Sequence, residues 1–207
     1  MMTHRCFVSL LTCAIALTLA VGCSSTPKKT DPSPKTVSGT DEQIFIGDTV
    51  EKNYDPNVIM KRAEAFFDKE DYQEAIMEYR HFLDLHRIHV LAAYAQFKLA
   101  DSHLKMVKSV DRDPDPMYKA MEQFEKLVRD YAGSRDVGEA KDKIRTCRDL
   151  IAQHHFYVGQ FYYRREAYLA AAKRFELILK EYPEVDLSTD SLYYLAKTYD
   201  DLGATEW

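Results

Sequence analysis

Glycine, proline and tryptophan are scarce in this chain. Its 207 residues include seven Gly, seven Pro and one Trp. A β-sandwich or barrel needs a turn roughly every 8–12 residues, and this sequence has too few turn formers to supply them. Basic charge is also limited, because 28 Lys and Arg stand against 33 Asp and Glu. Nucleic acid requires a basic face, so the composition favours a helical protein without a nucleic-acid partner.

Long apolar runs are absent except at the N-terminus. There MMTHR precedes CFVSLLTCAIALTLAVG, and Cys23 follows. A short basic start, an apolar run and small residues at its end predict a signal peptide over residues 1–22. The run is short for a membrane span, and Ser9 and Thr12 interrupt it. LAVGC resembles a lipobox despite Ala20 in place of the commoner Leu, so we expect Cys23 to be lipidated. The alternative is an ordinary signal peptide with a chance Cys.

Cysteine is rare in the remaining chain, where Cys147 would be the one free thiol after acylation of Cys23. No intramolecular disulfide would then be possible, and we expect Cys147 to be a small buried side chain. The lipobox resemblance implies more than one acyl chain on Cys23, which gives stable membrane anchoring. Because Ser24 rather than Asp follows, it also implies sorting to the outer membrane, facing the periplasm.

A tether is predicted over residues 23–52. Residues 24–40 contain three Pro and no large apolar side chain except Val37, which is typical of a flexible segment. Ile44, Phe45 and Ile46 either dock on the domain that follows or belong to a plain spacer.

A repeat pattern occupies residues 53–207. A small residue is followed at offsets 3, 12, 16 and 19 by an aromatic, a second small residue and two large side chains. These positions are Ala63, Phe66, Ala75, Tyr79 and Phe82, and again Gly159, Tyr162, Ala171, Phe175 and Ile178. This spacing is the tetratricopeptide signature. The small residues allow paired helices to approach closely, and Pro183 closes the second of these units.

Two further copies complete the pattern. One comprises Ala100, His103, Ala120, Phe124 and Leu127, with a loop eight residues longer that reads SVDRDPDP; another begins at Ala196 and Tyr199. We therefore predict an all-α tetratricopeptide (TPR) solenoid of about 3.5 repeats with a concave face. Helices are expected at 56–69, 72–86, 90–107, 116–131, 135–164, 168–182 and 188–202.

Capping signals agree with this frame. Asp55 and Asp115 each precede a Pro, as an N-cap followed by N1 would. Asp71 with Glu74 resembles a capping box, and Ser134 is expected to cap the long helix.

The run HFYVGQFYYRREAY at 155–168, with AAKRF at 171–175 and Tyr182-Pro183, resembles the family of the outer-membrane protein assembly factor BamD. The lipobox, the extended loop and the long helix share this resemblance, which covers most of residues 23–207. It implies a lipoprotein that binds the barrel-forming assembly subunit, other assembly lipoproteins and unfolded outer-membrane protein substrates. In that family the N-terminal repeats are linked to substrate recognition and the C-terminal repeats to docking. Family members carry more repeats, so we expect the end near Leu202 to continue or to be covered by a partner.

A binding groove is expected along the first helix of each repeat, at positions three before, one after and four after the small residue. These are Met60, Glu64 and Phe67, then Phe97, Asp101 and Leu104, then Phe156, Gln160 and Tyr163, with Tyr193, Lys197 and Asp200 in the last copy. The aromatics among them would accept an extended peptide with aromatic side chains. The alternative is that these rings pack inside the solenoid. Arg164 and Arg165 would either pair with a partner carboxylate or balance the helix dipole.

The sequence contains no recognisable catalytic or metal-binding motif. There is no phosphate-binding Gly loop and no nucleophile elbow. Three groups come nearest to a metal site, namely His81/His86/His89, His154/His155 and Asp111/Asp113/Asp115, and none has the required spacing. We therefore expect no catalysis, no cofactor and no metal. The competing function is a periplasmic TPR adaptor for another envelope, division or secretion complex.

Overall fold

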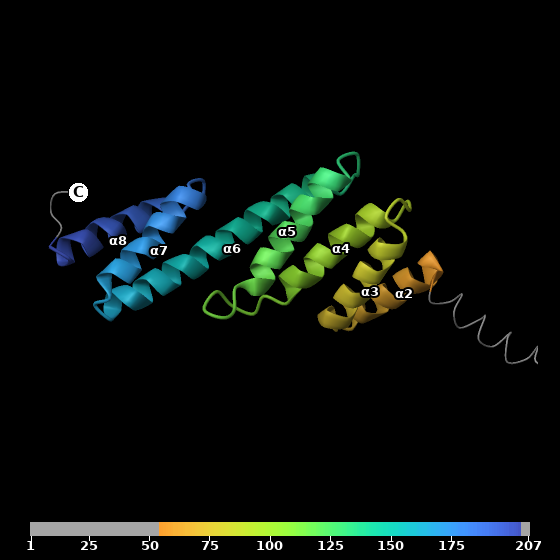
Figure 1. Cartoon of the computed structure of the whole chain (residues 1–207), viewed down its shortest axis with the longest axis horizontal. Helices are drawn as coiled ribbons and strands as arrows, with labels where there is room; N and C mark the ends of the chain where they lie inside the picture. Colours follow the sequence, from red (N-terminus) through yellow and green to blue (C-terminus); the bar gives the residue numbers. More distant parts are fainter. Residues whose placement is uncertain (1–53, 204–207) are drawn as a thin grey trace, which may run out of the picture. The chain divides into compact units, whose positions relative to one another are not determined.

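The computed structural model describes residues 54–203, and the regular structure in that range is entirely α-helical (Figure 1). The helices are α2 (Pro56–Asp68), α3 (Tyr72–Leu85), α4 (Ala92–Lys105), α5 (Asp115–Asp130), α6 (Val137–Arg164), α7 (Tyr168–Glu181) and α8 (Ser188–Asp201). All seven helices expected from the sequence are present, and each end lies within two residues of its predicted position.

Each helix packs against the next one along the chain, from α2 through α8. The pairs α2–α3 and α4–α5, and the second half of α6 with α7, are the repeat units, and α8 begins a further one (Figure 1). The prediction of an all-α TPR-type repeat fold is confirmed.

Small residues stand where neighbouring helices touch. Ala63, Ala75 and Ala100 are fully buried, as are Ala120 and Ala171. Gly159 in α6 approaches α7 so closely that an added Cβ would lie 2.7 Å from the ring of Phe175. Such contact leaves no room for a side chain, which explains why the repeat requires small residues at these offsets.

The hydrophobic core is divided along the chain. One cluster joins α2, α3 and the first half of α4 around Tyr79 and Phe82. A second joins α4, α5 and the start of α6 around Phe124 and Cys147, and a third joins α5, α6 and α7 around Phe175. The expectation of a small buried side chain at Cys147 is confirmed, and this burial raises the pKa of its thiol to about 12.

The capping predictions were only partly right. The Asp55 side chain accepts hydrogen bonds from the backbone N–H groups of Asn57 and Val58, at 2.7 and 3.1 Å, as expected. Asp71 makes no side-chain capping bond, so the capping box was wrong. Helix α5 begins one residue early, at Asp115, with Pro114 in the cap position. Ser134 forms a turn with Asp136, which takes the cap position of α6 instead.

Two turns share a left-handed residue. Glu70 ends the α2 turn with φ 63°, and Glu166 ends the α6 turn with φ 60°. Both lie seven residues after the small residue of their repeat. In the first, the N–H of Asp71 donates to the Phe66 carbonyl at 3.0 Å and the N–H of Glu70 to Phe67, also at 3.0 Å. This is a Schellman motif, which replaces side-chain capping at these helix ends.

The extended loop between α4 and α5 is held by the long helix. His154 Nδ1 lies 2.6 Å from the carbonyl oxygen of Val110, while the adjacent His155 bonds elsewhere. Within residues 54–203, no helix has both the length and the apolar character needed to cross a membrane.

Candidate protein-binding surface

The predicted groove residues divide by burial. Met60 is only 5% exposed and packs in the core of α2, α3 and α4, so it contributes to stability rather than to an accessible surface. Asp101 is 8% exposed, and its carboxylate pairs with Lys143 of α6 at 3.3 Å. Phe97 and Leu104 are half-buried against the cluster around Phe124, where the Phe97 and Phe124 rings meet edge to face with centroids 5.5 Å apart.

Phe67 forms an aromatic–cation contact between the first helices of repeats one and two. The ammonium nitrogen of Lys98 in α4 lies 3.9 Å from the centroid of the Phe67 ring and 5.8 Å from that of Tyr94. Glu64, one turn before Phe67, bonds to Tyr94. Burial, followed by the charge of Glu64 and this bond, raises the pKa of Tyr94 to about 12. A cation over a ring stabilises by about 0.5–1 kcal/mol at an exposed site.

Tyr163 makes the corresponding contact between α6 and α8. Its ring centroid lies 5.2 Å from the Lys197 ammonium and 6.0 Å from the centroid of Tyr194, and its hydroxyl donates to the carboxylate of Asp201. This bond to Asp201 is the main reason that the pKa of Tyr163 is raised. Phe156 adds an edge contact to Tyr194 at 5.4 Å. Gln160 is half-buried on the same helix.

These contacts give two aromatic–cation clusters. The first comprises Glu64, Phe67, Tyr94 and Lys98; the second comprises Phe156, Tyr163, Tyr194, Lys197 and Asp201. In both, an aromatic four residues after the small residue contacts a Lys on the first helix of the next repeat. A Tyr of that helix contacts the Lys in the first cluster and the aromatic ring in the second. Phe67 and Tyr163 are half-buried. Rings that are already held in place lose little entropy on binding, which suits recognition of apolar side chains.

Sequence reasoning missed Tyr94, Lys98 and Tyr194. Lys98 and Tyr194 both stand two residues before the small residue of their own helix. This shared position could have indicated from the sequence that both side chains face the preceding repeat. The angle at which two helices cross decides which residues of the second helix face the aromatic of the first. The spacing of residues within one helix does not define that angle.

Arg164 and Arg165 are both exposed at the end of α6. The guanidinium of Arg165 lies 4.8 Å from the Phe161 ring centroid, and Arg164 occupies the last turn, where a cation complements the helix dipole. Their role toward a partner stays a prediction. Cys23 and the tether lie outside the described residues. Among residues 54–203, no group of three or more His, Cys, Asp or Glu is arranged to hold a metal ion.

His155 links three helices. Arg174 of α7 can only donate, so its contact with His155 Nδ1 at 3.2 Å makes that nitrogen an acceptor. Nε2 then carries the proton and donates to the Tyr118 hydroxyl of α5 at 2.9 Å. Burial, then the charge of Arg174, lowers the pKa of His155 to about 4. The neutral ring therefore serves to position α5, α6 and α7.

A family model described as YfiO, outer membrane lipoprotein, matches residues 50–207. The chain is similar to three proteins named outer membrane protein assembly factor BamD. Identity is 26% over 148 residues with that of Rickettsia prowazekii, 23% over 218 with that of Vibrio cholerae and 27% over 151 with that of Neisseria meningitidis.

The share of each relative that is covered differs. The aligned parts make up 72%, 93% and 68% of this chain, in the same order, and 59%, 90% and 57% of the relatives. The chain therefore spans less than two thirds of the Rickettsia and Neisseria proteins and nearly all of the Vibrio protein.

Proposed function

Because this chain belongs to the YfiO family of outer membrane lipoproteins, as its resemblance to BamD predicts, we propose that it is a non-catalytic scaffold for outer-membrane protein assembly. The single observation that supports this most strongly is the family match to residues 50–207, a range that contains every described helix. The relatives named above carry the same role in their names. A stack of helix pairs presents a long surface in which each repeat contacts only its neighbours, which suits binding of extended partners.

The proposed binding surface is the pair of aromatic–cation clusters. Phe67 and Lys98 offer a ring and a charge at one end of the repeat array, and Tyr163 and Lys197 offer the same pair at the other. An extended unfolded segment with aromatic side chains would stack on these rings, while its carboxylates would meet the two lysines. The partners that fit are unfolded β-barrel substrates, the barrel-forming subunit and other assembly lipoproteins.

The proposed location is the periplasmic face of the outer membrane. The lipobox cysteine, Cys23, would carry the lipid, and Ser24 would direct sorting. A lipid with more than one acyl chain at Cys23 would hold the protein stably at the membrane.

Co-purification tests this proposal. The full-length lipoprotein, carrying an affinity tag, is purified from detergent-solubilised outer membrane, and bound proteins are identified by mass spectrometry. Recovery of a large β-barrel protein with periplasmic domains, lost when Phe67 and Tyr163 are replaced by Ala, is the expected result. Recovery of division or secretion proteins instead would support the adaptor function and refute the proposal.

A further inference from the structure

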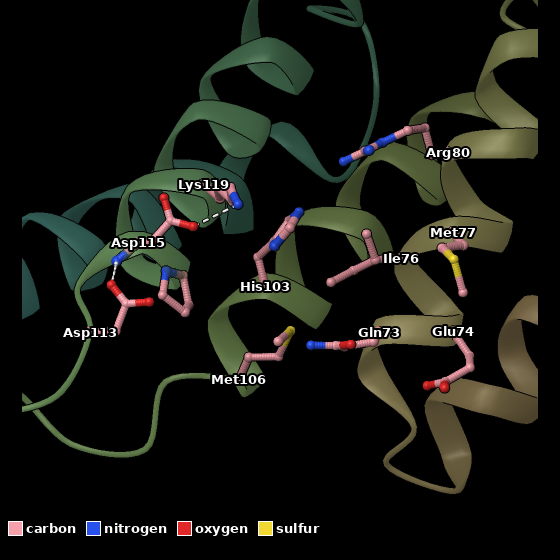
Figure 2. Close-up of a pocket in the computed structure, with 11 residues that line it drawn as sticks. Gln73, Glu74, Ile76, Met77, Arg80, His103, Met106, Asp113, Asp115 and Lys119 are labelled. Atoms are coloured by element: carbon pink, nitrogen blue, oxygen red, sulfur yellow. Dashed lines mark hydrogen bonds and ion pairs between the residues drawn. The ribbon is translucent and has the colours of Figure 1, made fainter.

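A pocket with a volume of about 410 Å³ lies between α3, the end of α4 and the start of α5 (Figure 2). Ile76 and Met77 of α3 and Met106 at the end of α4 give it an apolar part. Arg80 of α3 and His103 of α4 give it a polar part. None of these residues belongs to either aromatic–cation cluster.

The pocket coincides with two departures from the repeat pattern. The repeat that begins with Ala100 carries His103 three residues after its small residue. The other repeats carry an aromatic at that position, namely Phe66, Tyr162 or Tyr199. The loop that follows is eight residues longer than in the other repeats, and it brings Asp113 and the start of α5 to the pocket rim. The histidine and the longer loop both lie at the pocket. This coincidence indicates that they serve a function specific to the repeat that begins with Ala100.

His103 is a mostly buried residue whose ring lines the pocket. The residue is 6% exposed, and within residues 54–203 its ring makes no hydrogen bond to protein. Figure 2 shows the ring projecting into the space between Arg80 and Lys119. Burial, then the charges of Arg80 and Lys119, lowers its pKa to about 4. The ring is therefore neutral near pH 7 and holds one N–H donor available to a ligand.

Arg80 supplies a cation whose charge is not neutralised. Lys119 is paired with Asp115, with 2.6 Å between nitrogen and oxygen. Asp113 accepts a hydrogen bond from the backbone N–H of Asp115 at 3.1 Å. Arg80, by contrast, makes no ion pair or hydrogen bond in the described part of the chain. Glu74, the remaining acid of the lining, lies beside Met77 at the far end from His103 (Figure 2).

We propose that this pocket binds a segment of a partner protein in which an acidic side chain adjoins an apolar one. The carboxylate accepts from the guanidinium of Arg80 and from the ring N–H of His103. The apolar side chain rests on Ile76, Met77 and Met106. A guanidinium and a carboxylate match in a two-bond geometry, and the volume suits a short peptide segment. Because Met77 is 62% exposed, the apolar side would be covered only in the complex. This site goes beyond the proposed function, which uses the aromatic–cation clusters.

A capped peptide, acetyl-Ser-Gly-Leu-Glu-Leu-Gly-Ser-amide, is a suitable probe. It is titrated into the full chain in detergent while the methyl signals of Ile76, Met77 and Met106 are followed by NMR. Saturable shifts of these signals are expected. Replacing the peptide Glu by Gln, or Arg80 by Gln, should weaken binding about tenfold, as loss of a charge-assisted bond does.

Three variants separate this site from the rest of the molecule. His103→Phe restores the aromatic of the other repeats, fills the pocket and should abolish the shifts. Arg129→Gln, on the same helix as Lys119 but outside the pocket, should bind like wild type. Phe67→Ala should also bind like wild type, because the clusters are not involved. Equal binding of the Glu and Gln peptides, or unchanged binding by Arg80→Gln, would overturn the proposal and leave the proposed scaffold function untouched.

Discussion

Gly159 shows why the repeat needs a small residue where two helices pack together. Because Gly159 has no side chain, α6 and α7 can pack closely. A Cβ added at this residue would lie 2.7 Å from the ring of Phe175. Phe175 is fully buried and stacks on Tyr194 of α8, with ring centroids 5.5 Å apart. A substitution at Gly159 therefore disturbs three helices.

Gly159→Ala tests this contact. Ala favours a helix over Gly by about 1 kcal/mol, but overpacking a buried ring costs about 1–3 kcal/mol. We expect a net loss of up to about 2 kcal/mol in the free energy of unfolding, measured by urea titration. Gly138→Ala, in the same helix with nothing within 4 Å of the added carbon, should stabilise instead. Two changes of the same sign would contradict this account of the repeat.

Two buried histidines make stability depend on pH. The pKa of His103 and that of His155 are each lowered from 6.5 to about 4. The unfolded chain therefore takes up protons as pH falls below 6.5, while the folded chain stays neutral until about pH 4. Stability is fully present above pH 6.5 and is lost toward pH 4.

Unfolding by urea at pH 7.5 and pH 5.0 measures this effect. Each histidine should lower the free energy of unfolding by about 1–2 kcal/mol at the lower pH. His103→Phe should remove the part of this pH-dependent loss of stability that His103 causes. The part caused by His155 should remain. A pH dependence that is unchanged in this variant would show that His103 titrates normally.

At the scale of the element, the turns after α2 and α6 use a left-handed glutamate. A left-handed backbone costs an ordinary residue about 1 kcal/mol or more, and Glu70 and Glu166 both carry this cost. The Schellman bonds of these turns require the conformation whatever the side chain is.

Glu166→Gly is expected to stabilise the chain slightly, by up to about 1 kcal/mol, because glycine adopts positive φ without strain. Glu166→Ala is the matched control, since it also removes the carboxylate but keeps a Cβ. Thermal unfolding should rank the Gly variant above the Ala variant. Equal melting temperatures would mean that the turn is not strained.

The same elements show how far sequence reasoning reached. Helix positions were predictable because the small residues recur at fixed offsets, as Ala63 and Gly159 do. Asp71 was misread because backbone bonds, which a residue pattern does not reveal, close that turn. The pocket at His103 was not predictable because it joins α3 to a loop about 30 residues later. Lys98 was missed because its partner, Phe67, lies on another helix.

At the scale of the whole molecule, the proposed lipid anchor at Cys23 precedes the helical repeats in the sequence. We expect wild-type protein in the membrane fraction and the Cys23→Ser variant in the soluble periplasmic extract. Cys147→Ala, at the fully buried thiol, should remain with the membrane. Membrane attachment of the Cys23→Ser variant would show that the lipid is not the anchor.

We propose that the two aromatic–cation clusters act together in binding, because each places a lysine beside an aromatic ring at a different point along the chain. An extended partner that contacts both clusters gains affinity from each without new chemistry, since the second contact forms intramolecularly. Loss of either cluster should therefore weaken binding of a long unfolded segment more than binding of a short one.

Calorimetric titration of the purified chain with a peptide from the terminal strand of a β-barrel protein, rich in aromatic side chains, tests this claim most directly. Phe67→Ala and Tyr163→Ala should each weaken binding about tenfold, as loss of an aromatic anchor does. Tyr157→Ala, which removes a 41% exposed aromatic of α6 outside both clusters, should bind like wild type. Wild-type affinity in the Phe67 and Tyr163 variants, with the fold intact by circular dichroism, would contradict the account.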